Sequence, residues 1–142
     1  MFCDASILVP LFVTEPSSMA VMAMMGNEGK PVISDFAIGE VCSAISIRLR
    51  RREIERAEAD EIVSDLDLWA EQKAHRVVTE TSDIIHATRL VRRFDLGLRM
   101  PDALTLAIAQ RHNIPLATQD VRQAAAATAL GLRVITPTQL QT

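Results

Sequence analysis

The chain has 142 residues, of which 49% are hydrophobic, 23% charged and 4% aromatic, and its formal net charge is −3 at pH 7. This length is typical of one domain over residues 1–142, with a core that needs no disulfide or metal support. So few aromatic residues exclude base stacking as the main mode of nucleic-acid binding, and the acidic balance argues against a general affinity for polyanions. No apolar stretch is long enough for a membrane span, and the segment Met1–Asp4 lacks the basic region of a signal peptide. Because only two cysteines occur in an otherwise ordinary composition, a reducing compartment and hence a soluble cytoplasmic protein are expected.

Short strand-like segments alternate with longer helical ones. In chain order we expect a strand at Phe2–Asp4, a helix from about Ser6, a helix from Pro16 to Met25, a strand at Val32–Ser34, and a long helix from an N-cap at Asp35 to about Arg52. There follow a helix over Ala57–Lys73, a strand at Arg76–Val78, a helix from a cap at Thr81 or Ser82 that Gly97 ends, a helix from Pro101 over Ala103–Ala109, a strand at Pro115–Thr118, a helix over Val121–Leu130 and a strand at Arg133–Ile135. This alternation predicts an α/β fold with a parallel sheet and helices on both faces.

Four acidic residues differ from the acids on polar helix faces. Asp4 ends the first predicted strand, and Asp120 follows the fourth. Glu40 has small and apolar neighbours, and Asp102 opens an otherwise apolar helix. Because the carboxyl ends of parallel strands border the ligand crevice of an open α/β sheet, we expect Asp4, Asp102 and Asp120 to face one space. Taken singly, Asp35 and Asp102 are more simply interpreted as helix caps and Asp120 as a turn residue.

Carboxylates gathered in one crevice repel each other unless a cation neutralises them, and oxygen ligands suit Mg²⁺ or Mn²⁺. Zinc has no support, because the three histidines are scattered and Cys3 lies far from Cys42. These two cysteines are interpreted as buried small hydrophobes. Ser6 and Thr118, each two residues from one of the acids, could present hydroxyls to the same crevice or bond to local backbone.

Two other features allow two interpretations each. The four methionines of the second predicted helix could belong to the core, which is the safer interpretation, or form an adaptable docking surface; they are Met19, Met22, Met24 and Met25. The basic segment Arg48–Arg52 is either a solvated helix end or a contact for phosphate groups.

Four segments carry a resemblance to a known family. They are Cys3-Asp4-Ala5-Ser6-Ile7-Leu8-Val9, Ser34 through Glu40-Val41, Arg99-Met100-Pro101-Asp102-Ala103-Leu104 and Ala117-Thr118-Gln119-Asp120. Together they resemble PIN domains over nearly the whole chain, and most of all the small ribonuclease toxins of VapBC toxin–antitoxin systems. The sequence departs from this pattern at Thr105, where many relatives carry His.

The resemblance implies a PIN-like three-layer sandwich with about five parallel strands. It implies that a catalytic and metal-binding quartet holds Mg²⁺ or Mn²⁺, with two supporting hydroxyls; the quartet is Asp4, Glu40, Asp102 and Asp120, and the hydroxyls are those of Ser6 and Thr118. The activity implied is a metal-dependent endoribonuclease that hydrolyses RNA phosphodiester bonds, with a VapB-like antitoxin as partner and a homodimer as assembly.

Two alternatives come from other functional classes. The acids could serve a non-catalytic interaction module that binds a basic segment of a partner. A receiver-type phosphoacceptor also places Asp at strand ends, but it needs a lysine late in the sheet, and Lys30 and Lys73 lie elsewhere.

Overall fold

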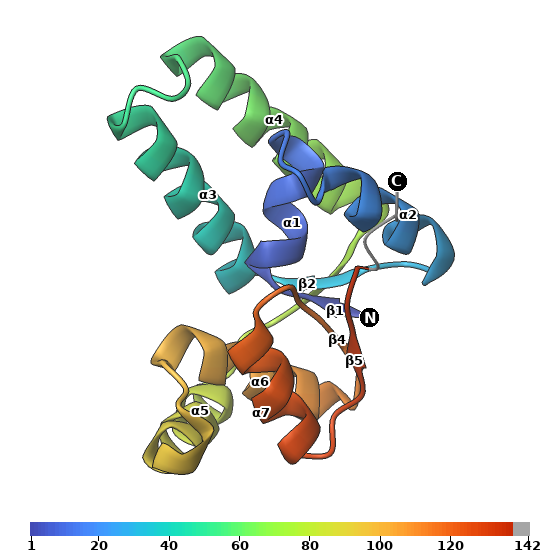
Figure 1. Ribbon diagram of the computed structural model, residues 1–142, viewed down its shortest axis with the longest axis vertical. Helices are drawn as coiled ribbons and strands as arrows, with labels where there is room; N and C mark the ends of the chain where they lie inside the picture. Colours follow the sequence, from blue (N-terminus) through green and yellow to red (C-terminus); the bar gives the residue numbers. More distant parts are fainter. Residues whose placement is uncertain (138–142) are drawn as a thin grey trace.

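A parallel sheet of five short strands lies between two layers of helices in the part of the chain that the computed structural model describes, residues 1–137 (Figure 1). Residues 138–142 of the predicted domain lie outside the described part. The strand order is β3-β2-β1-β4-β5, with Phe2 of β1 opposite Val32 on one side and Leu116 on the other. The strands are β1 Phe2–Cys3, β2 Val32–Ser34, β3 His75–Val77, β4 Leu116–Ala117 and β5 Val134–Ile135. The predicted α/β fold with a parallel sheet is confirmed.

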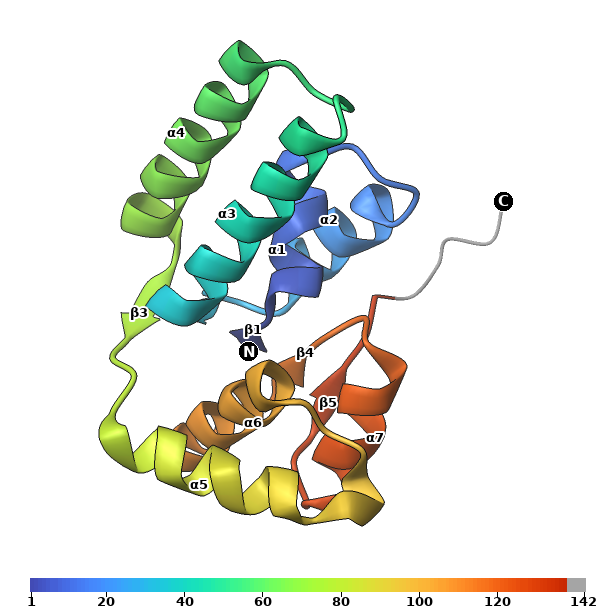
Figure 2. The ribbon, with the colours of Figure 1, turned by 90° about the vertical axis from the view of Figure 1, so that its left-hand side faces the viewer.

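The first layer contains the helices of the N-terminal half and packs on one face of the sheet (Figures 1 and 2). Ile33 of β2, Val41 of α3 and Leu66 of α4 are fully or almost fully buried in its core. The helices are α1 Ala5–Phe12, α2 Ser18–Asn27, α3 Asp35–Arg50 and α4 Arg56–Lys73. Figure 2 shows α3 and α4 as a pair that extends away from the sheet.

The second layer contains the helices of the C-terminal half and covers the opposite face (Figure 2). Its central helix is α6, in which the whole run Ala103–Ala109 is buried. Small alanine side chains let neighbouring elements approach this helix from several sides. The helices are α5 Thr81–Arg92, α6 Met100–His112 and α7 Val121–Ala129, with a short 3₁₀ turn at Phe94–Leu96. No helix within residues 1–137 is both long and apolar enough to cross a membrane.

Two predicted helix caps are wrong, because a neighbouring side chain performs the capping. The Ser34 hydroxyl accepts a hydrogen bond from the Ala37 amide at 3.1 Å, so Ser34 and not Asp35 caps α3. Glu80 caps α5 in place of Thr81 or Ser82, and it forms a reciprocal capping box with Asp83.

Two predicted helix bounds are also wrong. The helix expected from Pro16 begins at Ser18. The helix expected to continue to Gly97 ends at Arg92, and Phe94 lies in the 3₁₀ turn, where its ring is 86% exposed. Gly97 ends that 3₁₀ turn instead, with a φ of 61° in the left-handed region that glycine adopts without strain.

Candidate active site

The order of the strands places the ends of β1 and β4 side by side. The chain builds the sheet outward from β1 through β2 to β3, and then crosses to the other side of β1 to form β4 and β5. This reversal is the switch point at which open α/β sheets form a crevice. Asp4 follows β1 directly, and Thr118 follows β4 directly. The predicted meeting of these two strand ends is therefore observed.

Asp4 is held in one orientation by its position and by its hydrogen bonds. Its amide donates to the Ala117 carbonyl at 3.2 Å, which fixes the backbone beside β4. Its carboxylate caps α1, accepts a hydrogen bond from the Ser6 hydroxyl at 2.6 Å and accepts another from the Thr118 hydroxyl at 2.7 Å. With a side chain only 7% exposed and both oxygens engaged, Asp4 has a fixed place in the site.

The two hydroxyls predicted to face the crevice also connect the start of α1 to the loop after β4. The Ser6 hydroxyl accepts a hydrogen bond from the Gln119 amide at 2.8 Å, and the Gln119 side chain donates to the Ser6 carbonyl at 2.6 Å. The Thr118 hydroxyl accepts from the Asp120 amide at 3.0 Å. Ser6 lines the acidic cavity described below, as one interpretation expected, and its backbone partner is distant in sequence. Thr118 is fully buried, does not belong to the cavity lining, and bonds to the local Asp120 amide as well as to Asp4.

All four predicted acids border one cavity of about 150 Å³. Glu40 reaches it from the first turns of α3, and Asp102 from the first turn of α6. Asp120 caps α7 by accepting from the Gln123 amide at 2.8 Å. The cavity lining consists of Asp4, Ala5, Ser6, Glu40, Asp102, Thr105, Asp120 and Gln123.

The charges in this cavity are poorly compensated by the protein. Burial raises the pKa of Asp4, and its hydrogen bonds to Ser6 and Thr118 act in the opposite direction. Burial, and then the negative charges of Asp4 and Asp102, raise the pKa of Glu40 to about 7. The Arg99 guanidinium lies 3.7 Å from an Asp102 carboxylate oxygen, but Arg99 is itself largely exposed. The site therefore favours binding of a positive ligand.

The side chains that line the cavity have the chemistry that a divalent cation requires, although they are not arranged as a ready-made set of metal ligands. The polar side chains of the lining offer oxygen atoms, which are the ligands that Mg²⁺ and Mn²⁺ prefer. Within residues 1–137, however, no group of three or more His, Cys, Asp or Glu side chains is arranged so that it could hold a metal ion directly. The four carboxylates line the cavity from separate elements of the fold.

Two residues of the cavity were missed as candidates from the sequence. Thr105 was noted only as a departure from the family pattern, yet it is 3% exposed and lines the cavity. Gln123 was not noted at all. The available signal was a polar residue three positions after Asp120 in an alanine-rich helix, on the face that also buries Ala126 and Ala127.

The structure also bears on the two interpretations given above for the methionines of α2 and for the basic segment Arg48–Arg52. The core interpretation holds for Met24 but is wrong for Met19 and Met22, which are 68% and 51% exposed. Within the basic segment, Arg48 pairs with Glu15 and, at 3.7 Å, with Glu53, whereas Arg50, Arg51 and Arg52 are exposed at the end of the helix.

The two cysteines differ in their surroundings. Cys3 is fully buried, and burial raises the pKa of its thiol to about 12, so that it behaves as a small hydrophobe. Cys42 is half-buried rather than buried.

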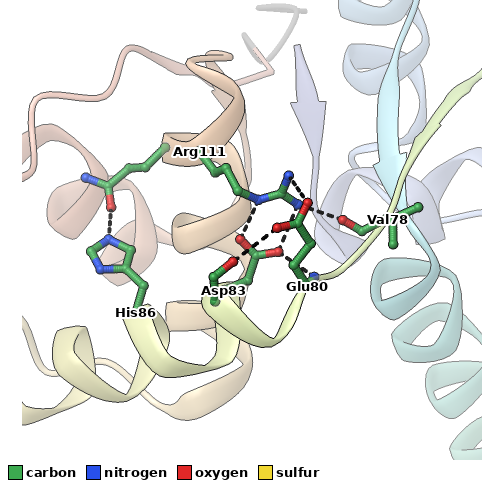
Figure 3. Close-up of polar contacts among 7 residues, drawn as sticks. Val78, Glu80, Asp83, His86 and Arg111 are labelled. Carbon is green, nitrogen blue, oxygen red and sulfur yellow. Dashed lines mark hydrogen bonds and ion pairs between the residues drawn. The ribbon is translucent and has the colours of Figure 1, made fainter.

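A second buried carboxylate lies outside the cavity, in the ion-pair cluster of Arg111 (Figure 3). The Arg111 guanidinium donates to both oxygens of Asp83 at 2.7 and 2.9 Å, to Glu80 at 3.1 Å and to the Val78 carbonyl at 2.7 Å. Burial of Asp83 acts to raise its pKa, but the Arg111 hydrogen bond and the Glu80 amide overcome this and leave the pKa below its usual value. In this cluster, unlike in the cavity, a guanidinium of the protein neutralises the buried carboxylate, and the pair joins α5 to α6.

Comparison with known proteins gives one family and a set of related structures. The family model described as PIN domain matches residues 1–129. A crystal structure of Mycobacterium tuberculosis VapC20, a sarcin–ricin loop cleaving toxin, is 14% identical, with a TM-score of 0.70 over 99% of this chain and 98% of that one. A toxin–antitoxin complex from Klebsiella pneumoniae is 21% identical, with a TM-score of 0.64 over 98% of both chains.

A third structure, FitAcB from Neisseria gonorrhoeae, is 14% identical, with a TM-score of 0.69 over 98% of this chain and 99% of that one. No curated protein sequence matches the chain. At these identities the structural matches establish the shared fold.

Proposed function

Since the chain belongs to the PIN-domain family, we propose that it is a metal-dependent endoribonuclease, the toxin of a type II toxin–antitoxin system, built as a single PIN domain over residues 1–142. The observation that carries this proposal is the convergence of four acids from four separate elements on one cavity; they are Asp4, Glu40, Asp102 and Asp120. Two of the three structural relatives compared with this chain are described as a toxin or a toxin–antitoxin complex.

In the proposed site the four acids hold Mg²⁺ or Mn²⁺. When bound, the cation supplies Lewis-acid activation of water and stabilises charge on the leaving oxygen of the phosphodiester. The contribution of this chain is to keep the oxygens in place. Ser6 and Thr118 hold the Asp4 carboxylate by its two oxygens, and the Asp120 carboxylate is oriented by its bond to the Gln123 amide. Such orienting bonds support a charged site because its members need not rearrange during the reaction.

Substrate access is proposed along a second hollow that shares Asp102 and Asp120 with the cavity. Arg99 and Arg122 line this hollow, and both are exposed. Guanidinium groups match phosphate geometry, so these residues would contact the RNA backbone on either side of the scissile bond. Neutralising the four acids would reverse the sign of the formal net charge, which favours a polyanionic substrate only for the loaded protein.

The proposed partner is a VapB-like antitoxin that places a basic side chain in the acidic cavity and apolar side chains on α2. Met19 and Met22 project into solvent from this helix and provide adaptable apolar contacts. A homodimer remains part of the proposal through the family resemblance. Growth arrest on expression of the chain alone, relieved by the small protein encoded beside it, is the expected result. Harmless accumulation of the folded chain would contradict it.

The decisive experiment incubates purified protein with structured RNA in Mg²⁺ or Mn²⁺, with and without chelator. We expect cleavage that requires the cation, and the mapped 5′ ends identify the cut. The matched control is Asp60→Asn, which changes an exposed acid paired with Arg56 and leaves the cavity intact. If the wild-type chain binds a basic peptide at the cavity but never cleaves RNA, the non-catalytic interaction module is correct instead.

A further inference from the structure

Gln123 is a buried polar residue of the cavity that the proposed mechanism uses only through its backbone. Its side chain is 2% exposed and lies in the cavity lining together with the four acids. Its carboxamide nitrogen lies 3.5 Å from the Asp102 carbonyl oxygen, the outer limit of a hydrogen bond. Its carboxamide oxygen, Oε1, has no hydrogen-bond partner among residues 1–137.

Packing and capping do not explain this side chain. Buried amide oxygens are normally hydrogen-bonded, because the free energy lost on leaving water is not recovered otherwise. A methionine of similar size would fill the same space and leave no polar atom without a partner. The cap of α7 needs only the Gln123 amide, which Asp120 binds at 2.8 Å. Gln123 lines the cavity, which makes a ligand bound there the candidate partner of Oε1.

The surroundings define the chemistry of that ligand. Oε1 can only accept a hydrogen bond or contact a cation, and the other polar groups of the cavity are mainly carboxylates, which are also acceptors. A ligand that satisfies all of them must present positive charge or several donors. The cavity of about 150 Å³ equals the liquid volume of about five waters, taking roughly 30 Å³ for each. It is thus large enough for an ion with part of its water shell.

We infer that Gln123 is a neutral member of the divalent-cation site, and that its Oε1 accepts a hydrogen bond from the water shell of the cation held by the four acids. This inference rests on the proposed function. Because the amide is neutral, it adds an oxygen to the site without adding a fifth negative charge to acids that already repel one another. Gln123 is accordingly a positioning residue for the cation.

The test measures cation binding directly, without RNA. Mn²⁺ is titrated calorimetrically into the wild-type chain, Gln123→Met, Gln123→Glu and the control Thr79→Val, and each protein is melted in chelator. Thr79 is a suitable control because its hydroxyl oxygen is also buried without a partner in the described chain, but lies outside the cavity lining.

We expect Gln123→Met to weaken Mn²⁺ binding by about 10-fold, the lower end of the effect of losing an outer contact to a metal site. Its melting temperature in chelator should stay the same or rise, since a stranded polar atom has been removed. Gln123→Glu should bind Mn²⁺ more tightly than wild type and melt lower in chelator. Thr79→Val should bind Mn²⁺ as wild type does.

Two results would overturn the inference while the proposed function stands. In the first, wild type binds Mn²⁺ and cleaves RNA, and Gln123→Met binds Mn²⁺ equally well. In the second, Gln123→Met and Gln123→Glu both lose affinity and both melt lower in chelator, as expected of a purely structural residue. If wild type binds no Mn²⁺, the inference and the proposed function are both wrong.

Discussion

Asp4 and Asp83 are both buried aspartates in this chain, yet their pKa values shift in opposite directions. Asp4 is 7% exposed and Asp83 2% exposed, so burial alone would raise the pKa of both. The partners of Asp4 are neutral hydroxyls, and its pKa is raised. The partner of Asp83 is the Arg111 guanidinium, which donates to both of its oxygens, and its pKa is lowered (Figure 3).

This difference separates a structural carboxylate from a candidate functional one. Asp83 is neutralised within the protein and joins two helices of the second layer. Asp4 shares its cavity with three further acids, and the pKa of Glu40 is raised to about 7 by burial and by the charges of Asp4 and Asp102. A buried acid in this chain therefore indicates a ligand site only where the protein supplies no matched cation.

The largest expected effect is on the activity proposed for the cavity. Asp4→Asn and Glu40→Gln should each reduce RNA cleavage by at least about 100-fold, because the acids share one charged site. The double variant should lose little more than either single one. The measurement is a cleavage time course in Mn²⁺, with circular dichroism to confirm folding. Full activity of folded Asp4→Asn would refute the assignment of the cavity as the active site.

The next effect concerns the stability supplied by the Arg111 cluster. Arg111→Met leaves the Asp83 carboxylate buried without its cation, and we expect a loss of about 3 kcal/mol in the free energy of unfolding. Urea denaturation measures this loss. The double variant Arg111→Met with Asp83→Leu should recover part of it, since no buried charge is left. Mn²⁺ affinity should not change in either protein, and a change would show that the two regions are coupled.

The substitution Glu40→Gln is expected to raise the free energy of unfolding in chelator, by less than Arg111→Met lowers it. The pKa of Glu40 in the folded chain is about 7, against an ordinary value of 4.5 for a glutamate carboxyl. Between these values the folded chain binds more protons than the unfolded one, so this group makes stability fall as pH rises from 4.5 towards 7. Glutamine removes that loss, and because the site is only half-buried we expect a gain of about 1 kcal/mol at pH 7.

Thermal melts of wild type and Glu40→Gln at pH 5 and pH 7, with and without Mn²⁺, check this prediction. Added Mn²⁺ should stabilise wild type more than the variant. Asp83 has the opposite pH dependence, because its pKa is lowered in the folded chain. The stability that the Asp83 carboxylate supplies is complete above the usual carboxyl pKa and is lost only as pH falls through the lowered value. Equal melting temperatures of both proteins at pH 7 in chelator would show that the repulsion is negligible.

The smallest effect is expected at the exposed arginines beside the cavity. Arg122→Gln should raise KM for RNA a few-fold, leave kcat nearly unchanged and reduce the salt dependence of binding by about one phosphate contact. Arg92→Gln, a change on α5 outside the hollow, provides the control. If the two variants have the same KM and the same salt dependence, RNA does not follow the hollow that Arg122 lines.

Local patterns were sufficient to predict the order of the elements and to place Asp4, Asp102 and Asp120 at one space, whereas Glu40 joined them only through the family resemblance. The strand Val32–Ser34 was predicted to the residue, and the helix expected over Ala57–Lys73 differs from α4 by one residue. Asp4 and Asp120 could be predicted to meet because parallel strands bring their carboxyl ends to one edge of the sheet. These features depend on spacing along the chain or on general topology, and both can be read without knowing which side chains touch.

Features that depend on contacts between distant residues could not be predicted. Gln123 enters the cavity because α7 packs with one particular face inward, and nothing local requires that face. Asp83 looks like an ordinary acid of a first helical turn until Arg111, which lies 28 positions away, is placed against it. Met19 and Met22 were assigned to the core from their hydrophobicity, although the helix turns them to solvent.

The central position of β1 has a consequence for how the chain acquires its shape during synthesis. The first strand to leave the ribosome is the middle of the sheet, and one of its two neighbours, β4, is made more than a hundred residues later. The bond between Asp4 and Thr118 spans 114 positions, so it forms only when nearly all of the chain has emerged. Closing so long a loop is slow compared with forming local helices. A nascent chain therefore assembles its N-terminal helices early and completes the acidic cavity last, so the cavity proposed as the active site is absent while most of these residues are being made.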